Sequence, residues 1–346
     1  MIKRHLFFMG LSLLTVCSLN AEKIVQCITN FQIDADFYTQ ALQKRGYDGK
    51  VVVVSEKDYA DALLKKNGKW LKRLHLDFMN KVALPKDVDK IVFFNLSPKV
   101  SHKYDLSRLP KEKLVLFMWE PKTVLRRMYH PKVQNYFSQV YTWDDSLLDG
   151  KTYFKFHYPV LCPMLEELPS FEEKKFCTLV ASDLKSSYEN ELYSARKESI
   201  RFFEKIGEKG FEFYGRRWNP EEYSSYRGPI ADKLGTIKNY RFSICYENTH
   251  GTQGYVTEKI FDCFAAGSVP VYWGADNIDQ YVPKDCFIDR RFFSTMEELY
   301  SFLKGMKKEE YDGYIARIKT FLKSDAAQRF TLAQLEEDFY RSVVAN

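Results

Sequence analysis

The chain has 346 residues, which is long for one hydrophobic core and favours two domains. Hydrophobic residues make up 45% of the sequence and aromatic residues 16%, as in a globular protein. The formal net charge of +6 falls to +4 without Lys3 and Arg4, and acids and bases are interspersed. So mild a charge argues against nucleic acid as a partner.

The first 21 residues have the pattern of a targeting segment. Basic "MIKRH" precedes the uncharged apolar run Leu6–Leu19, and the small residue Ala21 follows. This order is typical of a secretory signal peptide cleaved after Ala21, because the apolar run is shorter than the about 20 residues of a membrane span. The alternatives are an uncleaved anchor, which would associate the protein with a membrane, and a buried first strand. The segment predicts an extracytoplasmic or secretory-pathway protein, in a Golgi-like lumen if the source is eukaryotic.

Residues 22–165 alternate short apolar runs with polar or helical stretches. The runs have the length of strands and lie at Lys23–Ile28, Val51–Val54, Lys90–Leu96, Lys113–Trp119 and Gln139–Trp143. Continuous apolar strands in this rhythm predict a parallel sheet covered on both faces. Prolines then interrupt both kinds of element within Tyr158–Ser170, which predicts a domain boundary near residue 165.

The same pattern restarts in residues 166–325. A helix is expected at Asn190–Gly210, and strands are expected at Phe176–Ser182, Phe211–Gly215, Tyr240–Asn248 and Val269–Gly274. Residues 326–346 predict a further amphipathic helix at the C-terminus. The fold class is therefore α/β, with two Rossmann-like parallel-sheet domains that face a cleft, and ligands are expected beyond the carboxyl ends of the strands.

Cysteines and acidic pairs give no metal pattern. The six cysteines that follow Cys17 include no CxxC, and several lie in strand-like apolar runs, which indicates buried thiols. The acids of "DAD" (Asp34–Asp36) and the pair Asp144 and Asp145 lie in loop or helix-start positions, where acids are common caps. We expect neither a metal site nor a required cofactor.

The densest group of polar residues lies in "YENTHGTQGYVTEKIFDCFAAGSVPVYWG", Tyr246–Gly274. A strand ends at Glu247 and Asn248, a loop with two glycines follows, and Thr257 is a good N-cap for a short helix. Glu258 and Lys259 then occupy the first helical turn. A helix N-terminus with a lysine favours phosphate, whereas a glutamate could accept hydrogen bonds from sugar hydroxyls.

Arg196 is a second candidate because it lies on the apolar face of its predicted helix. Leu192 and Ile200 are one turn away on either side. A charge that faces inward needs a partner, which could be a structural ion pair or a ligand.

The segment Tyr246–Gly274 strongly resembles the donor-binding motif of the α-1,3/4-fucosyltransferases, glycosyltransferase family 10. That pattern is a strand ending in F-E-N, a glycine-bearing loop, Y-x-T-E-K, an apolar helix and P-V-Y-W-G, and here Tyr246 replaces the phenylalanine. The resemblance covers roughly residues 110–295. It implies a GT-B fold, with GDP-β-L-fucose in the C-terminal domain and the acceptor in the N-terminal domain, and an inverting displacement.

Carried over residue by residue, the resemblance implies that Lys259 holds the pyrophosphate and Glu258 the ribose hydroxyls of the donor. Asn248 and Tyr255 would line the sugar and phosphate pocket. Arg196, which follows the strand "LVAS", would neutralise the pyrophosphate.

Glu120 is the candidate catalytic base. An inverting transfer needs a carboxylate that takes the proton of the acceptor hydroxyl, and Glu120 ends the predicted strand of "KLVLFMWEP". The family carries a glutamate here, in forms resembling E-S-P. A strand-end carboxylate that meets solvent or a lysine is the alternative, and Glu247 is the next candidate base.

The sequence thus predicts a fucosyltransferase that uses GDP-fucose and an oligosaccharide or glycoconjugate acceptor. N-acetylglucosamine O3 is the expected acceptor position, and a 1,3 or a 1,4 linkage stays open. The alternatives are an inverting transferase for another nucleotide sugar and a non-catalytic glycan- or nucleotide-binding protein on the same fold. The intact set of Glu120, Arg196, Glu258 and Lys259 argues against the last.

Overall fold

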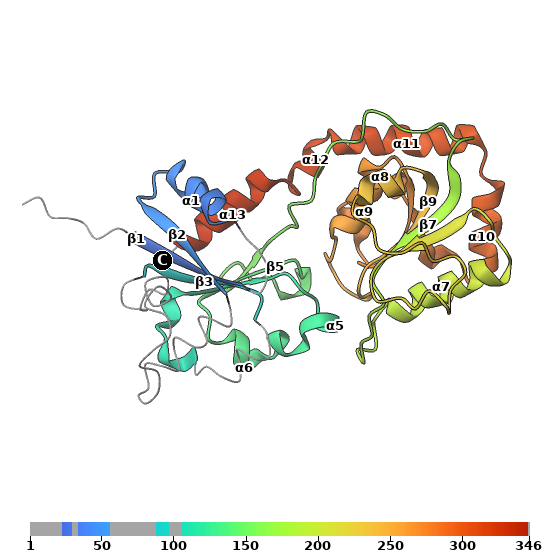
Figure 1. Cartoon of the computed structure of the whole chain (residues 1–346). Helices are drawn as coiled ribbons and strands as arrows, with labels where there is room; N and C mark the ends of the chain where they lie inside the picture. The colour runs from blue at the N-terminus through green and yellow to red at the C-terminus, as the bar shows by residue number, and fades with distance from the viewer. Residues whose placement is uncertain (1–22, 30–33, 56–87, 97–105, 345–346) are drawn as a thin grey trace, which may run out of the picture.

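The computed structural model describes residues 23–29, 34–55, 88–96 and 106–344. These residues form two parallel sheets, each with helices against it, in two regions that lie side by side (Figure 1). The predicted signal or anchor, residues 1–21, lies outside the described ranges. Within them, no helix combines the length and the apolar character that a membrane span requires.

The first region is built on a six-stranded sheet in which every neighbouring pair is parallel. Its order is β2 (Gly49–Ser55), β1 (Lys23–Thr29), β3 (Lys90–Phe94), β4 (Leu114–Met118), β5 (Gln139–Thr142) and β6 (Tyr153–Lys155). The five predicted apolar runs all form strands. The edge strand β6 was not expected, because it is three residues long and only partly buried.

The second region is built on a five-stranded parallel sheet. Its order is β11 (Ile288–Asp289), β10 (Val269–Trp273), β9 (Tyr240–Tyr246), β7 (Lys175–Val180) and β8 (Phe211–Tyr214). Because β8 and β9 lie on opposite sides of β7, the strand order reverses there. In open parallel sheets, ligands bind in the crevice at such a point, outside the carboxyl ends of the strands.

Helices connect and cover the strands of both sheets. They are α1 (Ala35–Gln43), α5 (Lys122–Leu125), α6 (Pro131–Gln134), α7 (Tyr193–Lys205), α8 (Lys233–Ile237), α9 (Glu258–Ala265), α10 (Met296–Gly305), α11 (Lys308–Leu322), α12 (Asp325–Gln328) and α13 (Leu332–Val344). The predicted helix at Asn190–Gly210 is α7, which is shorter than expected at both ends.

The C-terminal helix α13 returns to the first region. It lies beside α1 in Figure 1, and its buried side chains Leu335, Phe339 and Val343 belong to the core cluster that contains Val25 and Phe117. The chain therefore crosses between the regions twice, first after β6 and again at α12. A domain boundary at residue 165 remains a proposal, and α13 is packed with the first sheet rather than standing apart.

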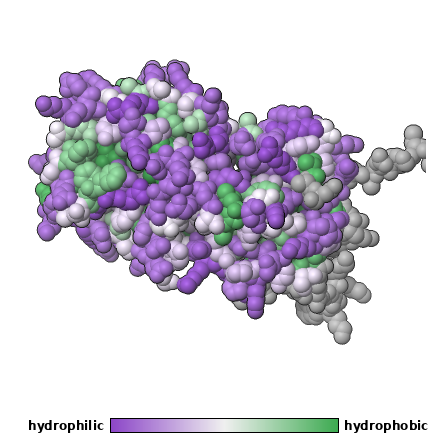
Figure 2. All heavy atoms as spheres, turned by 180° about the vertical axis from the view of Figure 1, so that it is seen from behind, coloured by the Kyte–Doolittle hydropathy of each residue, from purple (hydrophilic) through white to green (hydrophobic). Residues whose placement is uncertain are grey.

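The described cysteines behave as the sequence predicts. All six are free, and all except Cys162 are buried. The surface seen from behind is mostly hydrophilic, with hydrophobic areas in both regions (Figure 2). Phe292 is the most exposed large hydrophobic residue of the described chain, at 80%.

Candidate active site

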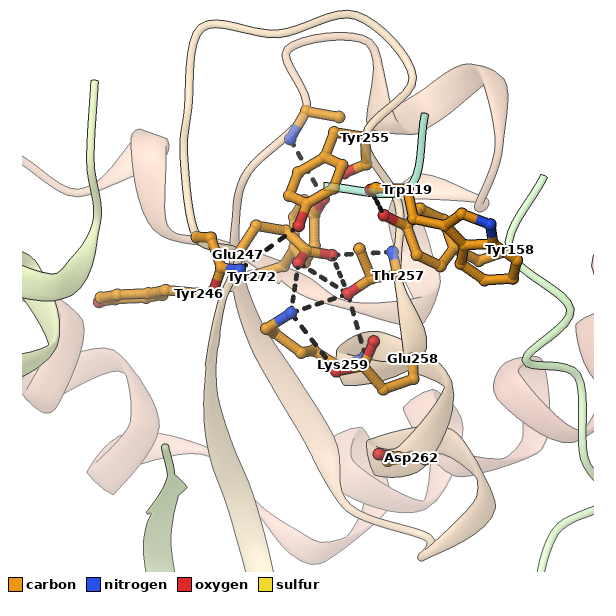
Figure 3. A network of polar contacts seen from close by, with 12 residues as sticks. Trp119, Tyr158, Tyr246, Glu247, Tyr255, Thr257, Glu258, Lys259, Asp262 and Tyr272 are labelled. Carbon is orange, nitrogen blue, oxygen red and sulfur yellow. Dashed lines mark hydrogen bonds and ion pairs between the residues drawn. The ribbon is translucent and has the colours of Figure 1, made fainter. Parts of the chain in front are cut away.

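The candidate site begins where β9 ends in the second region. Strand β9 is apolar and buried, and it delivers Glu247 and Asn248 at its carboxyl end. After the loop of residues 249–256, the Thr257 side chain accepts a hydrogen bond from the backbone N–H of Lys259 and caps α9. Apolar side chains of α9, among them Ile260 and Phe264, are fully buried and fix the orientation of the helix. Figure 3 shows Glu258 and Lys259 of its first turn beside Thr257 and Glu247.

Glu247 is the centre of a buried hydrogen-bond network (Figure 3). Its side chain is 0% exposed. Its Oε1 accepts from the Thr257 backbone nitrogen at 2.9 Å and from Thr257 Oγ1 at 3.0 Å. Its Oε2 accepts from Lys259 Nζ at 2.9 Å and from Thr257 Oγ1 at 2.7 Å. A buried carboxylate is stable only when its charge is paired and its oxygens are bonded, and both conditions hold here.

Lys259 and Glu258 share this network but remain accessible. The Lys259 side chain is 20% exposed and the Glu258 side chain 47%, and the two charged groups are 3.5 Å apart. Burial alone would lower the pKa of Lys259, but the charges of Glu247 and Glu258 outweigh it and raise that pKa above the ordinary value. Burial likewise opposes the ionisation of Glu258, yet Lys259 and Lys233 hold its pKa at about 2. Both groups are charged at neutral pH.

Arg196 reaches the same strand end from α7. It is buried, and its Nη2 donates to the carbonyl oxygens of Tyr246 and Glu247 at 2.7 Å each and to Asn248 Oδ1 at 3.1 Å. The inward-facing charge is thus satisfied by backbone carbonyls and an amide, not by a carboxylate. No described residue accepts a hydrogen bond from Nη1 or Nε, so these donors could bind an anion.

Lys233 is a third cation of this cluster, and sequence reasoning missed it. It precedes α9 in the chain, pairs with Asp262 at 2.5 Å, and lines one small cavity together with Arg196 and Lys259. The cavity lies against the ends of β7 and β9, where the strand order reverses. The only sequence signal for Lys233 is Asp232, the N-cap residue before it. Three cations thus line this crevice, and two of them, Lys233 and Lys259, are also paired with carboxylates.

Tyr255 and Asn248 connect the cluster to the first region. The Tyr255 ring is buried against Trp143, with 4.6 Å between ring centroids, and against Tyr158 at 6.0 Å. Asn248 Nδ2 donates to the Tyr255 hydroxyl at 3.5 Å. Tyr255 therefore sits directly against aromatic side chains of the first region.

Glu120 lies at the carboxyl end of β4, as the sequence predicts. Its backbone is held firmly: its N–H donates to Asn95 Oδ1 at 3.0 Å, and its carbonyl accepts from the Tyr129 hydroxyl at 2.9 Å. None of the described residues donates a hydrogen bond to its carboxylate. Burial raises the pKa of Glu120 above the ordinary value, Lys259 opposes that shift, and Glu258 and Glu247 add to it.

The structure therefore brings the predicted residues of both regions to one place. The charges of Lys259 and Glu258, in the second region, act on Glu120 in the first region. One expectation is corrected: Glu247 is a poor alternative base, because it is wholly enclosed and both of its oxygens are bonded. Asp34 and Asp144 cap helices as expected. Among the described residues, no group of three or more His, Cys, Asp or Glu side chains could hold a metal ion.

Comparison with known proteins identifies the second region. Residues 169–332 match the family model described as "Glycosyltransferase family 10 (fucosyltransferase) C-term". The chain is 26% identical to the Alpha-(1,3)-fucosyltransferase FucT of Helicobacter pylori over 151 residues, which is 44% of this chain and 28% of that protein. It is 41% identical to an Alpha-(1,4)-fucosyltransferase of Arabidopsis thaliana over 70 residues, or 20% of this chain and 17% of that one. The matched segments thus span less than a third of either relative.

The fold as a whole resembles solved structures. A crystal structure of an alpha1,3-fucosyltransferase with GDP-fucose superposes with a TM-score of 0.53 and 15% sequence identity, and the match covers 99% of this chain and 94% of that one. The same enzyme type without a named ligand gives a TM-score of 0.57 at 15% identity, covering 95% and 92% of the two chains. At this identity the likeness establishes the fold, and the GT-B architecture expected from the sequence is confirmed.

Proposed function

We propose that the chain, whose residues 169–332 match the model of glycosyltransferase family 10, is an inverting fucosyltransferase that moves L-fucose from GDP-β-L-fucose to a hydroxyl of a glycan. The observation that carries the proposal is that a carboxylate of the first region and a group of cations of the second region belong to one site. A carboxylate without a hydrogen-bond donor among the described residues, Glu120, faces a cluster of cations that could hold a diphosphate.

The donor side would act mainly through charge. Arg196 and Lys259 would bind the pyrophosphate and stabilise the negative charge that grows on it as the bond to fucose breaks. Glu258, ionised and half-exposed, would accept hydrogen bonds from the ribose hydroxyls. Asn248 and Tyr255 would enclose the sugar and phosphate between the regions.

The acceptor side would supply the base. The acceptor oxygen would attack the anomeric carbon while Glu120 takes its proton and the oxygen of the β-phosphate leaves with the bonding electrons. A raised pKa suits this role, because a general base works best when its pKa approaches the working pH. All charge changes in this scheme are met by side chains, so no metal is required.

The acceptor is proposed to be an oligosaccharide or glycoconjugate with N-acetylglucosamine O3 as the reacting hydroxyl. This expectation rests on the relatives, one of which is a mouse "4-galactosyl-N-acetylglucosaminide 3-alpha-L-fucosyltransferase 9", 30% identical over 150 residues. That segment covers 42% of this chain and 36% of the mouse protein. A secretory or membrane-associated location is proposed from residues 1–21 alone.

The decisive assay incubates the protein with GDP-fucose, GDP-mannose and a set of UDP-sugars, each with an N-acetyllactosamine panel, and analyses the linkage of any product. Transfer from GDP-fucose alone to O3 is expected. Turnover with another nucleotide sugar would replace the donor assignment, and an O4 product would change the linkage. Tight binding of GDP without turnover would favour a non-catalytic binding protein.

Metal independence is a separate prediction of the same scheme. We expect EDTA to leave fucose transfer largely intact, because the scheme needs no cation besides Arg196, Lys233 and Lys259. The measurement is the initial rate before and after chelation. Complete loss that manganese restores would contradict it.

A further inference from the structure

Two adjacent aspartates of the first region have different partners. Asp144 closes its own turn by accepting from the backbone N–H and hydroxyl of Ser146. Asp145 reaches the second region instead. Its Oδ2 accepts from the Tyr281 hydroxyl at 2.5 Å and from Asn277 Nδ2 at 2.9 Å. Its Oδ1 accepts from Lys155 Nζ at 2.7 Å.

The same residues hold the loop that precedes α9. The backbone N–H of Asp145 donates to the carbonyl of Gln253 at 3.1 Å. The backbone N–H of Gly254 donates to Asn277 Oδ1 at 2.8 Å, so the amide that binds Asp145 also binds the loop. The loop is therefore tied to Asp145 both directly and through Asn277.

Gly254 shows how close this approach is. Its φ of +86° lies in the left-handed region that favours glycine. A Cβ atom added there would lie 2.4 Å from the Trp143 carbonyl oxygen and 2.8 Å from Asp145 Oδ2. The loop backbone thus rests on the first region, and a side chain at this position would force the two apart.

Lys155 completes the arrangement from the edge strand β6. Its ammonium donates to Asp145, to the Trp143 carbonyl at 2.8 Å and to the Tyr281 hydroxyl at 2.7 Å. Burial opposes ionisation of Asp145, but the hydrogen bonds from Lys155, Tyr281 and Asn277 lower its pKa below the ordinary value. Asp145 is therefore a charged acceptor on both oxygens at neutral pH.

The residues that follow the loop are those of the candidate donor site. Tyr255 comes directly after Gly254, and Thr257, Glu258 and Lys259 come next. We propose that Asp145 is a positioning residue: a carboxylate of the acceptor-side region that fixes the donor-binding loop of the opposite region. Its action on donor binding rests on the proposed function, whereas its hold on the loop does not.

Hydrogen exchange in the ligand-free protein tests the hold on the loop. Asp145→Asn replaces one acceptor oxygen by a donor NH₂, so either Lys155 or the pair of Tyr281 and Asn277 loses its acceptor. We expect the peptide that spans residues 249–257 to exchange about tenfold faster or more, as for loss of a charge-assisted hydrogen bond. Asp279→Asn is the matched control, because Asp279 is an exposed acid nearby that pairs with Lys284.

Tyr281→Phe is the second variant, since it removes one donor to Asp145 and keeps the ring. A smaller acceleration in the same peptide is expected. If Asp145→Asn does not fold, Tyr281→Phe decides alone. Unchanged exchange in the folded variants, or equal acceleration in Asp279→Asn, would overturn the proposal.

Ligand measurements separate this proposal from the proposed function. GDP is first titrated into the wild-type protein by calorimetry, and failure to bind would count against the donor assignment while leaving the exchange result valid. Where GDP binds, Asp145→Asn should weaken it and raise KM for GDP-fucose about tenfold, with a smaller change in kcat. A lower kcat at unchanged KM and GDP affinity would contradict a loop-positioning role.

Discussion

The two faces of the candidate site, one in each region, hold their charged groups in opposite ways. In the second region, Glu247, Thr257 and Lys259 form a closed network, and Arg196 is bonded to the carbonyls of the strand end. In the first region, Glu120 is fixed by its backbone alone, and none of the described residues donates to its carboxylate.

This difference matches two different tasks. Groups that bind a charged ligand gain from being held in place beforehand, because less freedom is lost on binding. A general base must exchange a proton with an incoming hydroxyl, so its oxygens cannot be committed to other donors. The asymmetry therefore predicts that changes on the two faces will affect different kinetic constants.

The largest effect is expected for Glu120→Gln. The amide keeps the size of the side chain but cannot take a proton, and removal of a general base typically lowers the rate by about 10²–10⁴. The measurement pairs steady-state kinetics with a GDP-fucose titration on one preparation. Donor affinity should barely change, because the cation cluster is intact.

Glu112→Gln is a suitable control, since Glu112 is an exposed acid just before β4. Glu120 is not the base if the Glu120→Gln enzyme binds donor normally and transfers fucose within about threefold of the wild-type rate. The expected loss of rate is about 10²–10⁴. The comparison between the faces would then lose its functional meaning.

On the opposite face, Lys259 should affect binding and transfer together. The single change Lys259→Ala would lower both about tenfold or more, because a charge-assisted contact to the diphosphate is worth roughly 1.5–3 kcal/mol. It would also leave the buried Glu247 without its ion-pair partner, which is destabilising by itself.

A matched pair of variants isolates the contribution of the contact between Lys259 and the diphosphate. Glu247→Gln alone keeps the ammonium, and we expect donor affinity to stay within a few-fold of wild type. Glu247→Gln combined with Lys259→Met removes both charges, and affinity should fall about tenfold further. Equal donor affinity in the two variants would exclude Lys259 from phosphate binding.

The sequence predicts the strands and the local structure of Tyr246–Gly274 well because both follow local rules. Apolar runs became strands, and Thr257 caps α9 with Ile260 and Phe264 inward. What it does not predict depends on distant contacts. The pairing of Glu247 with Lys259 needs the loop to fold back, and Lys233 joins only because α8 packs beside α9.

The crossing of α13 to the first region has the same kind of cause. Its amphipathic pattern predicts a helix with one buried face but not the surface that covers it. Phe339 meets Tyr38 of α1 with 4.5 Å between ring centroids, across most of the chain length. Asp145, similarly, is an ordinary turn residue in the sequence, and only the fold gives it Tyr281 and Asn277 as partners.

The pH dependence of kcat/KM tests how the two faces interact, because the charge of Glu258 on one face affects the pKa of Glu120 on the other. Glu120 must be ionised to act, and its pKa is raised by burial and further by Glu258. We therefore expect activity to fall with decreasing pH at a midpoint above the about 4.3 of an ordinary glutamate. Glu258→Gln removes a negative charge, so the midpoint should move to lower pH, by less than about one unit at this degree of exposure. A midpoint that moves upward would contradict the electrostatic coupling.

The smallest effect concerns a second buried carboxylate, Asp338 of α13, which contrasts with Glu247. Its Oδ1 accepts from Gln334 Nε2 at 2.9 Å, whereas Oδ2 is buried without a partner. Burial raises its pKa to about 6, against the opposing influence of Gln334 and Arg341. The folded state thus binds its proton more tightly than the unfolded chain, whose aspartates titrate near about 3.9. The stability that this proton provides is present below pH of about 4 and is lost as the pH rises through about 6.

Asp338→Asn removes that loss, so the apparent Tm should rise by a few degrees at pH 7.5 and change little at pH 4, as scanning calorimetry would show. Glu247→Gln should instead lower the Tm at pH 7.5, because both of its oxygens are bonded. An Asp338→Asn protein that is less stable at pH 7.5 would mean that the carboxylate is satisfied in solution and that the two regions treat buried charge alike.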